Sequence, residues 1–381
     1  MDYSGHKSKR SENNIIIKKL YRLPWMFLAV LFVILSIGIA LLYSASGGKF
    51  DPWASKQIKH LIISIPIMIT VAIIDIRFWF RNSYLIYLGG LALLVLVYLI
   101  GVEGGLGAKR WLRFAGFTFQ PSEIMKVCLV VVLARYFHMT HVYSIKRLSI
   151  LVVPFIFIGA AVILILKQPN LGTATIVACT SAAIIFMAGV SWKKFAFAGV
   201  LFLIALPVAW SNMHDYQKKR VDTFLNPEKD PLGAGYNIIQ SKIAIGSGGV
   251  WGKGYLKGTQ GRLSFVPEKQ TDFIFSIVAE EFGFVGSIFV LILYTILILM
   301  GIRISMLSES NFGSLVAFGI ITILFIHVFV NMGMVMGILP VVGVPLPLLS
   351  YGGSSLLSTM AGFGFILNVY VHRDVKLESM E

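Results

Sequence analysis

Long apolar runs, separated by short polar stretches, repeat along nearly the whole chain. An α-helix needs about 20 apolar residues to cross the roughly 30 Å hydrocarbon core of a bilayer, and ten runs approach or exceed that length. The predicted segments are about 24–45, 58–76, 83–102, 122–138, 148–167, 171–190, 193–212, 272–300, 313–337 and 355–372. The pattern therefore predicts an all-α, polytopic membrane protein with about ten transmembrane helices.

The composition agrees with this prediction. Of the 381 residues, 57% are hydrophobic and only 13% are charged. A soluble domain keeps roughly a quarter of its residues charged, so this chain has too few charges to cover a surface in water. Its two cysteines, Cys128 and Cys179, both lie inside apolar runs. This position excludes a disulfide scaffold and indicates that they act as small hydrophobic side chains.

The formal net charge of +15 is carried by basic residues scattered among the loops. They form no stripe with interleaved aromatic residues, so we expect no nucleic-acid partner. The loops on the same side of the membrane as the N-terminus carry more than twice as many Lys and Arg residues as the short loops on the opposite side. Because loops rich in basic residues stay in the cytoplasm, both termini are predicted to be cytoplasmic.

The predicted organisation is a basic cytoplasmic tail at 1–22, a transmembrane domain at 23–373 and a cytoplasmic tail at 374–381. Residues 213–271 are predicted to be a large extracytoplasmic loop of short helices and turns. The stretches richest in Gly, Pro and polar residues each follow an odd-numbered segment, so all open on the same side. They are 103–121, 167–171, 213–271 and 338–354. We therefore predict that these stretches line a shared extracytoplasmic cavity.

Carboxylates within the apolar runs are candidates for chemistry, because an ionised group at membrane depth is costly. Glu123 and Lys126 are spaced i, i+3 and share a helix face. They form either a structural ion pair or, with Arg110 in the preceding loop, a site that holds a phosphate. Asp272 begins the eighth segment, where either the helix dipole favours it or it serves as a general base. Glu280 is expected on the Asp272 face, about two turns deeper.

Histidine residues form no cluster with metal-ligand spacing, and no HExxH motif occurs. His327 and Asn331 lie one turn apart within the ninth segment. This spacing favours a polar contact between helices over a set of ligands. The identity of any metal stays open.

Several motifs occur in a fixed order along the chain, among them Gln-Pro-Ser-Glu at 120–123 and Thr-Asp-Phe at 271–273. The full set covers 107–111, 119–126, 224–227, 230–236, 240–249, 258–260, 267–275, 280–281, 331–334 and 343–355. With these motifs the chain resembles the SEDS family (shape, elongation, division and sporulation) from about residue 25 to 372. Asn-Pro-Glu at 226–228 and Gly-Thr-Gln at 258–260 favour its elongation branch over its division branch.

The resemblance implies a ten-helix glycosyltransferase of the bacterial cytoplasmic membrane that polymerises lipid II into peptidoglycan strands for cell-wall elongation and rod shape. It implies a class B penicillin-binding transpeptidase and rod-complex membrane proteins as partners. The essential catalytic Asp of the family matches Asp272. The functional cavity residues of the family match Arg110, Glu123 and Lys126.

Lys269, Glu280, Ser350 and Gly352 lie within the matching motifs and are also predicted to bind substrate. One motif departs from the family pattern. Residues 168–173 read Gln-Pro-Asn-Leu-Gly-Thr, where the family usually has Asp in the third position. Any role that needs a negative charge there is in doubt, and Asn170 is expected to keep only a helix-capping role.

Under this hypothesis Asp272 removes the proton of an acceptor sugar hydroxyl while Arg110 and Lys126 stabilise the charge on a departing polyprenyl pyrophosphate. A divalent cation, magnesium or manganese, is an open cofactor. The alternatives are a lipid II flippase, a division-type homologue and a non-catalytic scaffold for the transpeptidase. A flippase needs no base, so it should keep working after Asp272→Asn.

Overall fold

Within the residues that the structure describes, the chain forms a bundle of ten helices that match the predicted segments. The structure is a computed structural model that describes residues 18–103, 109–114, 117–141, 147–212, 218, 222–229, 234–259 and 268–378. The long helices are α2 (Trp25–Ala45), α3 (Trp53–Ile73), α4 (Ile76–Ile100), α5 (Pro121–His138), α6 (Val152–Leu166), α7 (Leu171–Met187), α8 (Trp192–Asn212), α12 (Ile274–Leu307), α13 (Asn311–Val335) and α14 (Gly353–Val371). Each of the ten predicted segments coincides with one of these helices. The predicted all-α, polytopic membrane fold is therefore confirmed.

Some predicted features fall outside the described residues. They include residues 1–17 of the basic tail, 379–381 of the second tail and 107–108 of the first motif. Parts of the predicted outer loop are also outside, namely 213–217, 219–221, 230–233 and 260–267.

Helix α5 carries charged residues and is nevertheless mostly buried. Among the described residues, seven helices are long and apolar enough to cross a membrane by length and composition alone, and α5 is not one of them. It carries Glu123, Lys126 and Arg135, yet most of its residues are buried. The reason is its central position, packed against α4, α7 and α13. Charged side chains are tolerated at such a position because neighbouring helices supply partners.

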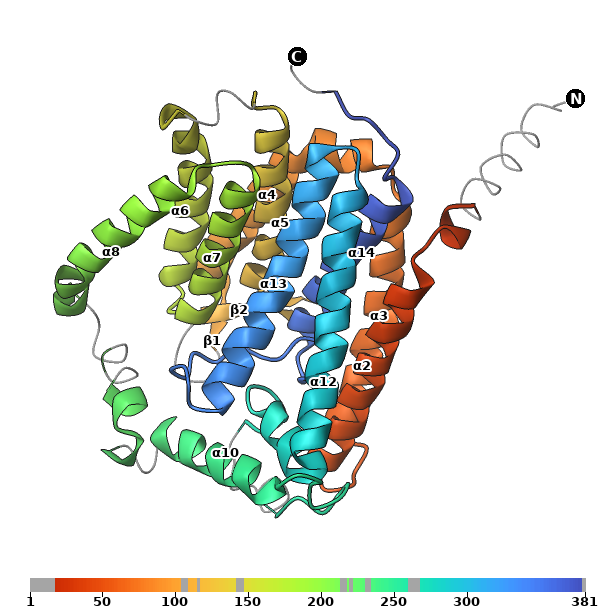
Figure 1. The fold of residues 1–381 in the computed structure, drawn as a ribbon, viewed down its shortest axis with the longest axis vertical. Helices are drawn as coiled ribbons and strands as arrows, with labels where there is room; N and C mark the ends of the chain where they lie inside the picture. Colours follow the sequence, from red (N-terminus) through yellow and green to blue (C-terminus); the bar gives the residue numbers. More distant parts are fainter. Residues whose placement is uncertain are drawn as a thin grey trace, which may run out of the picture.

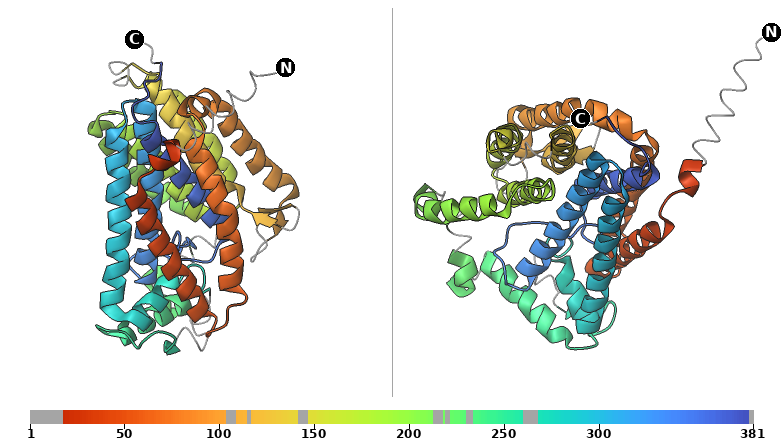
Figure 2. Two further views of the ribbon diagram at one scale, coloured as in Figure 1. Left: turned by 90° about the vertical axis from the view of Figure 1, so that its right-hand side faces the viewer. Right: turned by 45° about the horizontal axis from the view of Figure 1, so that its top comes forward.

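Figure 1 shows the helices running side by side, with the start of α2 and the end of α14 at the same end of the bundle. Helix α3 packs along α14, and α12 packs along α13. Helix α8 leans away from the other helices in Figure 1 and in the right-hand view of Figure 2. Because α2 begins and α14 ends at this same end, the arrangement agrees with an even number of membrane crossings.

Two helices begin earlier than their apolar runs predict. Helix α3 begins at Trp53, and its first turns include the polar residues Lys56 and Lys59, whose long stems can reach from apolar surface to water. Helix α4 begins at Ile76, where the Asp75 carboxylate caps it by accepting a hydrogen bond from the backbone N–H of Arg77 at 2.8 Å. An apolar run marks the membrane-embedded length of a helix, whereas its cap marks where the helix begins.

A small antiparallel sheet between α4 and α5 is absent from the sequence prediction. It consists of β1 (Val102–Glu103), β2 (Lys109–Phe114) and β3 (Phe117–Phe119), in the order β1-β2-β3. Such short strands give little alternation of polar and apolar residues to recognise. Strand β2 carries Arg110, a residue of the predicted site.

Helix α12 is divided by a break at Gly283, whose backbone is non-helical with φ +64°. The part after the break is by itself long enough to cross a hydrocarbon core of about 30 Å. The part before it, Ile274 to Phe282, is almost fully buried. The apolar run at 272–300 therefore comprises two helical pieces.

The break in α12 joins the helix to the predicted outer loop. That loop contains the 3-10 turn η4 (Pro227–Lys229) and helix α10 (Ala234–Gly248), as the prediction of short helices and turns requires. The segment after α10 forms four backbone hydrogen bonds with α12, two on each side of Gly283, with N···O distances of 2.9–3.1 Å. A Cβ atom at Gly283 would lie 2.3 Å from the backbone N of Gly252, so the two backbones meet too closely for a side chain.

Candidate active site

Segments that are far apart in the sequence enclose a cavity of about 230 Å³. Its lining includes a residue or more from each of the four stretches rich in Gly, Pro and polar residues, which confirms that these stretches share one cavity. Three of the lining residues carry ionisable side chains of the predicted site, namely Arg110, Glu123 and Asp272. The cavity lies toward the C-terminal end of α13, at the end of the bundle opposite to the two chain ends (Figure 1).

Asp272 lies in the turn that precedes α12, two residues before the helix begins. The Asn331 side chain on α13 donates hydrogen bonds to the backbone oxygens of Asp272 at 2.8 Å and Val344 at 2.7 Å. One amide therefore ties the Asp272 turn to the 340–350 segment. Gly343 allows the close approach, because a Cβ atom there would lie 3.4 Å from Asp272 Oδ2 and its φ is +70°.

Ser350 and Gly352, both predicted to bind substrate, have different surroundings. The Ser350 hydroxyl is buried, donates to the backbone oxygen of Thr271 and accepts from the backbone N–H of Leu346. Gly352 lines the cavity, whereas Ser350 is not among the lining residues. The Gln57 side chain on α3 contacts the backbone of both residues. It donates to the backbone oxygen of Ser350 at 3.1 Å and accepts from the backbone N–H of Gly352 at 3.3 Å. Ser350 therefore stabilises the Asp272 turn through the Thr271 carbonyl and does not line the cavity.

Arg110 lines the cavity from strand β2 and is fixed by the turn between α6 and α7. Its Nε donates to the backbone oxygen of Gln168 at 3.0 Å, and its Nη2 donates to that of Pro169 at 2.5 Å. The next residue, Asn170, caps α7 by accepting from the backbone N–H of Thr173 at 3.3 Å. The expected capping role of Asn170 is confirmed, and this residue also lines the cavity.

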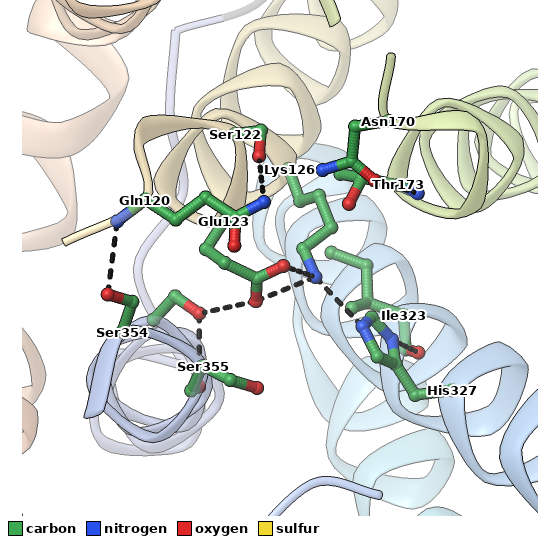
Figure 3. A network of polar contacts seen from close by, with 11 residues as sticks. Gln120, Ser122, Glu123, Lys126, Asn170, Thr173, Ile323, His327, Ser354 and Ser355 are labelled. Atoms are coloured by element: carbon green, nitrogen blue, oxygen red, sulfur yellow. Dashed lines mark hydrogen bonds and ion pairs between the residues drawn. The ribbon is translucent and has the colours of Figure 1, made fainter. Parts of the chain in front are cut away.

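Glu123 and Lys126 form the ion pair that their spacing predicts, with Nζ 3.0 Å from each carboxylate oxygen. Figure 3 shows the Lys126 ammonium between the Glu123 carboxylate and the His327 ring, whose Nε2 is 2.8 Å away. Ser358 on α14 donates to Glu123 at 3.3 Å. The contact between helices predicted for His327 and Asn331 is confirmed for His327, which contacts Lys126 on α5. Asn331 instead contacts the Asp272 turn and the loop at Val344.

The site differs from the sequence prediction in the position of Lys126. Glu123 and His327 line the 230 Å³ cavity, whereas Lys126 is not among its lining residues and is only 4% exposed. A direct contact between this ammonium and a phosphate in the cavity does not fit that position. Lys126 therefore contacts the lining residue Glu123, and Arg110 is the only Lys or Arg among the described residues that line the cavity.

Lys269 and Glu280 are not among the residues that line the cavity. Lys269 is buried, with its ammonium 5.9 Å from the centre of the Trp53 ring, and burial lowers its pKa below the ordinary value. Glu280 is buried and pairs with Lys253 at 2.8 Å, and it accepts from the backbone N–H of Thr259 at 2.7 Å. The expectation that Glu280 shares a helix face with Asp272 is wrong, because Asp272 precedes the helix.

Comparisons with known proteins identify the family of this chain. The Cell cycle protein family, which covers FtsW, RodA and SpoVE, matches residues 21–375. Peptidoglycan glycosyltransferase MrdB of Escherichia coli (strain K12) is 43% identical over 364 residues, which cover 95% of this chain and 97% of MrdB.

Two solved structures have the same fold. One, from work on the structural coordination of polymerization and crosslinking by a peptidoglycan synthase complex, has a TM-score of 0.81 at 30% identity and covers 92% of this chain and 98% of that one. The other is the rod shape determining protein RodA of Thermus thermophilus, with a TM-score of 0.70 at 28% identity and coverage of 93% and 98%.

The helical bundle and its polar cavity define a multi-pass membrane protein whose relatives are named for cell-wall synthesis. The chain belongs to the SEDS family, the family of FtsW, RodA and SpoVE.

Proposed function

We propose that this chain is a peptidoglycan glycosyltransferase that polymerises lipid II into glycan strands for cell-wall elongation and rod shape. The observation that carries the proposal is the cavity that Asp272 and Arg110 both line, formed by segments that are far apart in the sequence. A carboxylate and a guanidinium that line one partly enclosed polar cavity suit a reaction that removes a proton at one atom and develops negative charge at another.

The reaction joins an acceptor sugar hydroxyl to an anomeric carbon whose leaving group is polyprenyl pyrophosphate. Asp272 takes the hydroxyl proton as the oxygen attacks the anomeric carbon and the bond to the pyrophosphate breaks. Arg110 stabilises the charge that develops on the leaving pyrophosphate. A single displacement of this kind inverts the anomeric centre and needs no covalent enzyme intermediate.

A divalent cation in the cavity would depend on the substrate for most of its ligands. Among the described residues, no group of three His, Cys, Asp or Glu side chains is placed to hold a metal ion. Magnesium is often bound through one or two carboxylates with substrate phosphates and water, and Asp272 is a suitable carboxylate. Such a cation would add positive charge beside the pyrophosphate.

The orientation and partners follow the same proposal. The protein lies in the bacterial cytoplasmic membrane with both ends in the cytoplasm and the cavity on the outer side, where lipid II is polymerised. The proposed partners are a class B penicillin-binding transpeptidase and the rod-complex membrane proteins. Similarity to a chain from a peptidoglycan synthase complex supports the first of these.

The test is strand synthesis by purified protein in proteoliposomes that contain labelled lipid II, with polymer length and movement between leaflets scored together. Asp272→Asn should abolish polymer formation. Asp75→Asn is the matched control, because Asn caps a helix about as well as Asp and this residue lies at the start of α4.

Four outcomes separate the candidate functions. Polymer formation that depends on Asp272 supports the glycosyltransferase. Undiminished polymer formation by Asp272→Asn contradicts the base assignment. Leaflet exchange without polymer from the unmodified chain indicates the flippase, and neither activity indicates a scaffold for the transpeptidase.

A further inference from the structure

His327 is a buried histidine of the candidate site, and it has no role in the reaction proposed above. Its Nδ1 lies 2.7 Å from the backbone oxygen of Ile323, one turn earlier on α13. A carbonyl oxygen can only accept, so Nδ1 carries the hydrogen and Nε2 of the neutral ring is an acceptor. That acceptor faces the Lys126 ammonium at 2.8 Å.

The contact with His327 gives the buried Lys126 ammonium its third hydrogen-bond acceptor. A lysine has three N–H donors, and Lys126 has three acceptors within 3.0 Å, namely both Glu123 oxygens and His327 Nε2. Without His327, one donor would face a void of about 20 Å³ that Lys126, Glu123, His327 and Ser358 line together. A void of this size holds about one water molecule, so the ammonium would have space to turn away from Glu123.

The same helix also fixes the other cavity carboxylate. Asn331, one turn after His327 on α13, holds the backbone oxygen of Asp272. His327 holds Lys126, which in turn holds Glu123 (Figure 3). Two successive turns of α13 therefore set the positions of both carboxylates that line the cavity.

We infer that His327 is a positioning residue for the proposed glycosyl transfer: its Nε2 holds the Lys126 ammonium against Glu123 and so fixes the part of the cavity wall that Glu123 forms. The inference rests on the proposed function. It assigns His327 no proton transfer and no contact with substrate.

Two substitutions divide the contacts of the ring. Gln places an amide oxygen near the position of Nε2 and can accept from Lys126. Asn is shorter, so it can still donate to the Ile323 oxygen but leaves Lys126 without its third acceptor. Met at the same position fills a similar volume with only a weak acceptor and provides a second test of the lost contact.

The experiment measures the rate of lipid II polymerisation by the full-length chain in proteoliposomes, with rates divided by the monodisperse fraction from size-exclusion chromatography. His327→Gln should stay within about threefold of wild type, whereas His327→Asn and His327→Met should lower kcat by about tenfold or more. The KM for lipid II should change by less than about threefold, because His327 positions groups and holds no substrate.

Equal rates for the Gln and Asn variants, or a loss that resides in KM alone, would overturn the inference. It would also be overturned if Asn and Met variants fail to fold while the Gln variant folds, because the contact would then serve folding only. Wild type and Asp272→Asn are measured in the same assay. A wild type that forms no polymer would contradict the proposed function together with this inference, whereas an active wild type with an unimpaired Asn variant would contradict this inference alone.

Discussion

Removing the Lys126 ammonium should destabilise the whole bundle strongly, and the structure gives the size of the effect. The ammonium is 3.0 Å from the Glu123 carboxylate, and the two residues are 4% and 6% exposed. At that distance two unit charges attract by roughly 5 kcal/mol for an effective dielectric constant of about 20. Breaking a buried pair by removing one partner costs ~3–5 kcal/mol, because the remaining charge stays desolvated.

Lys126→Met should therefore lower the free energy of unfolding by ~3–5 kcal/mol, since Ser358 would be the one remaining hydrogen-bond donor to Glu123 among the contacts described above. Glu123→Gln in the same chain removes the unpaired charge. The double variant should therefore be more stable than Lys126→Met by roughly 1–3 kcal/mol, a coupling typical of side chains in direct contact.

The assay is reversible unfolding in mixed micelles of a mild detergent and increasing dodecyl sulfate, followed by circular dichroism. Lys376→Met is the control, because its pair with Glu309 is 3.9 Å long and both side chains are mostly exposed. That variant should unfold like wild type. The reasoning would be refuted if Lys126→Met also unfolds like wild type, or if the double variant loses the sum of the two single effects.

Three further predictions concern other parts of the chain. Arg110→Lys should lower kcat/KM about tenfold in the polymerisation assay, because one ammonium cannot hold the carbonyls of two successive residues as the guanidinium does; Arg113→Lys, exposed on the same strand, should leave the rate unchanged. Burial lowers the pKa of Lys269, so the unfolded chain binds more protons at this residue than the folded chain does. The stability of wild type relative to Lys269→Met should therefore rise as the pH approaches 10.5. A flat or falling difference in unfolding midpoints would contradict this sign. Gly283→Ala should sharply reduce the yield of monodisperse protein, because its φ is +64° and the added Cβ would overlap backbone, whereas Gly159→Ala in α6 meets open space and should express normally.

The sequence predicts the helices of this fold well because each one has to bury a long apolar run in a bilayer. It does not predict the break in α12, since the predicted segment 272–300 runs through Gly283 as one helix. The break depends instead on hydrogen bonds from the segment after α10, which is distant in sequence. The short strand that carries Arg110 is missed for a related reason, because its pairing with β1 and β3 gives no periodic pattern long enough to read.

The candidate site is predicted in part. Local spacing correctly indicates the pair of Glu123 and Lys126 and the cap formed by Asn170, because both are interactions within one helix. The role of Lys126 depends on His327, which is 201 residues away in sequence, so spacing could not show that the ammonium is already saturated. Gln57 gives no signal at all, because a single glutamine in the first turns of a helix resembles any other polar residue near the membrane boundary.

The two-part construction of α12 separates the reacting groups from the lipid around them. A thicker or thinner bilayer changes the tilt of a membrane-crossing helix, and we expect α12 to adjust in the part after the break at Gly283. Asp272 is held by Asn331 of α13, and its turn by Ser350 through the neighbouring carbonyl of Thr271. The distance between Asp272 and Arg110 should thus stay constant in membranes of different lipid composition. We therefore expect the rate of the chemical step to be insensitive to the chain length of the surrounding lipids.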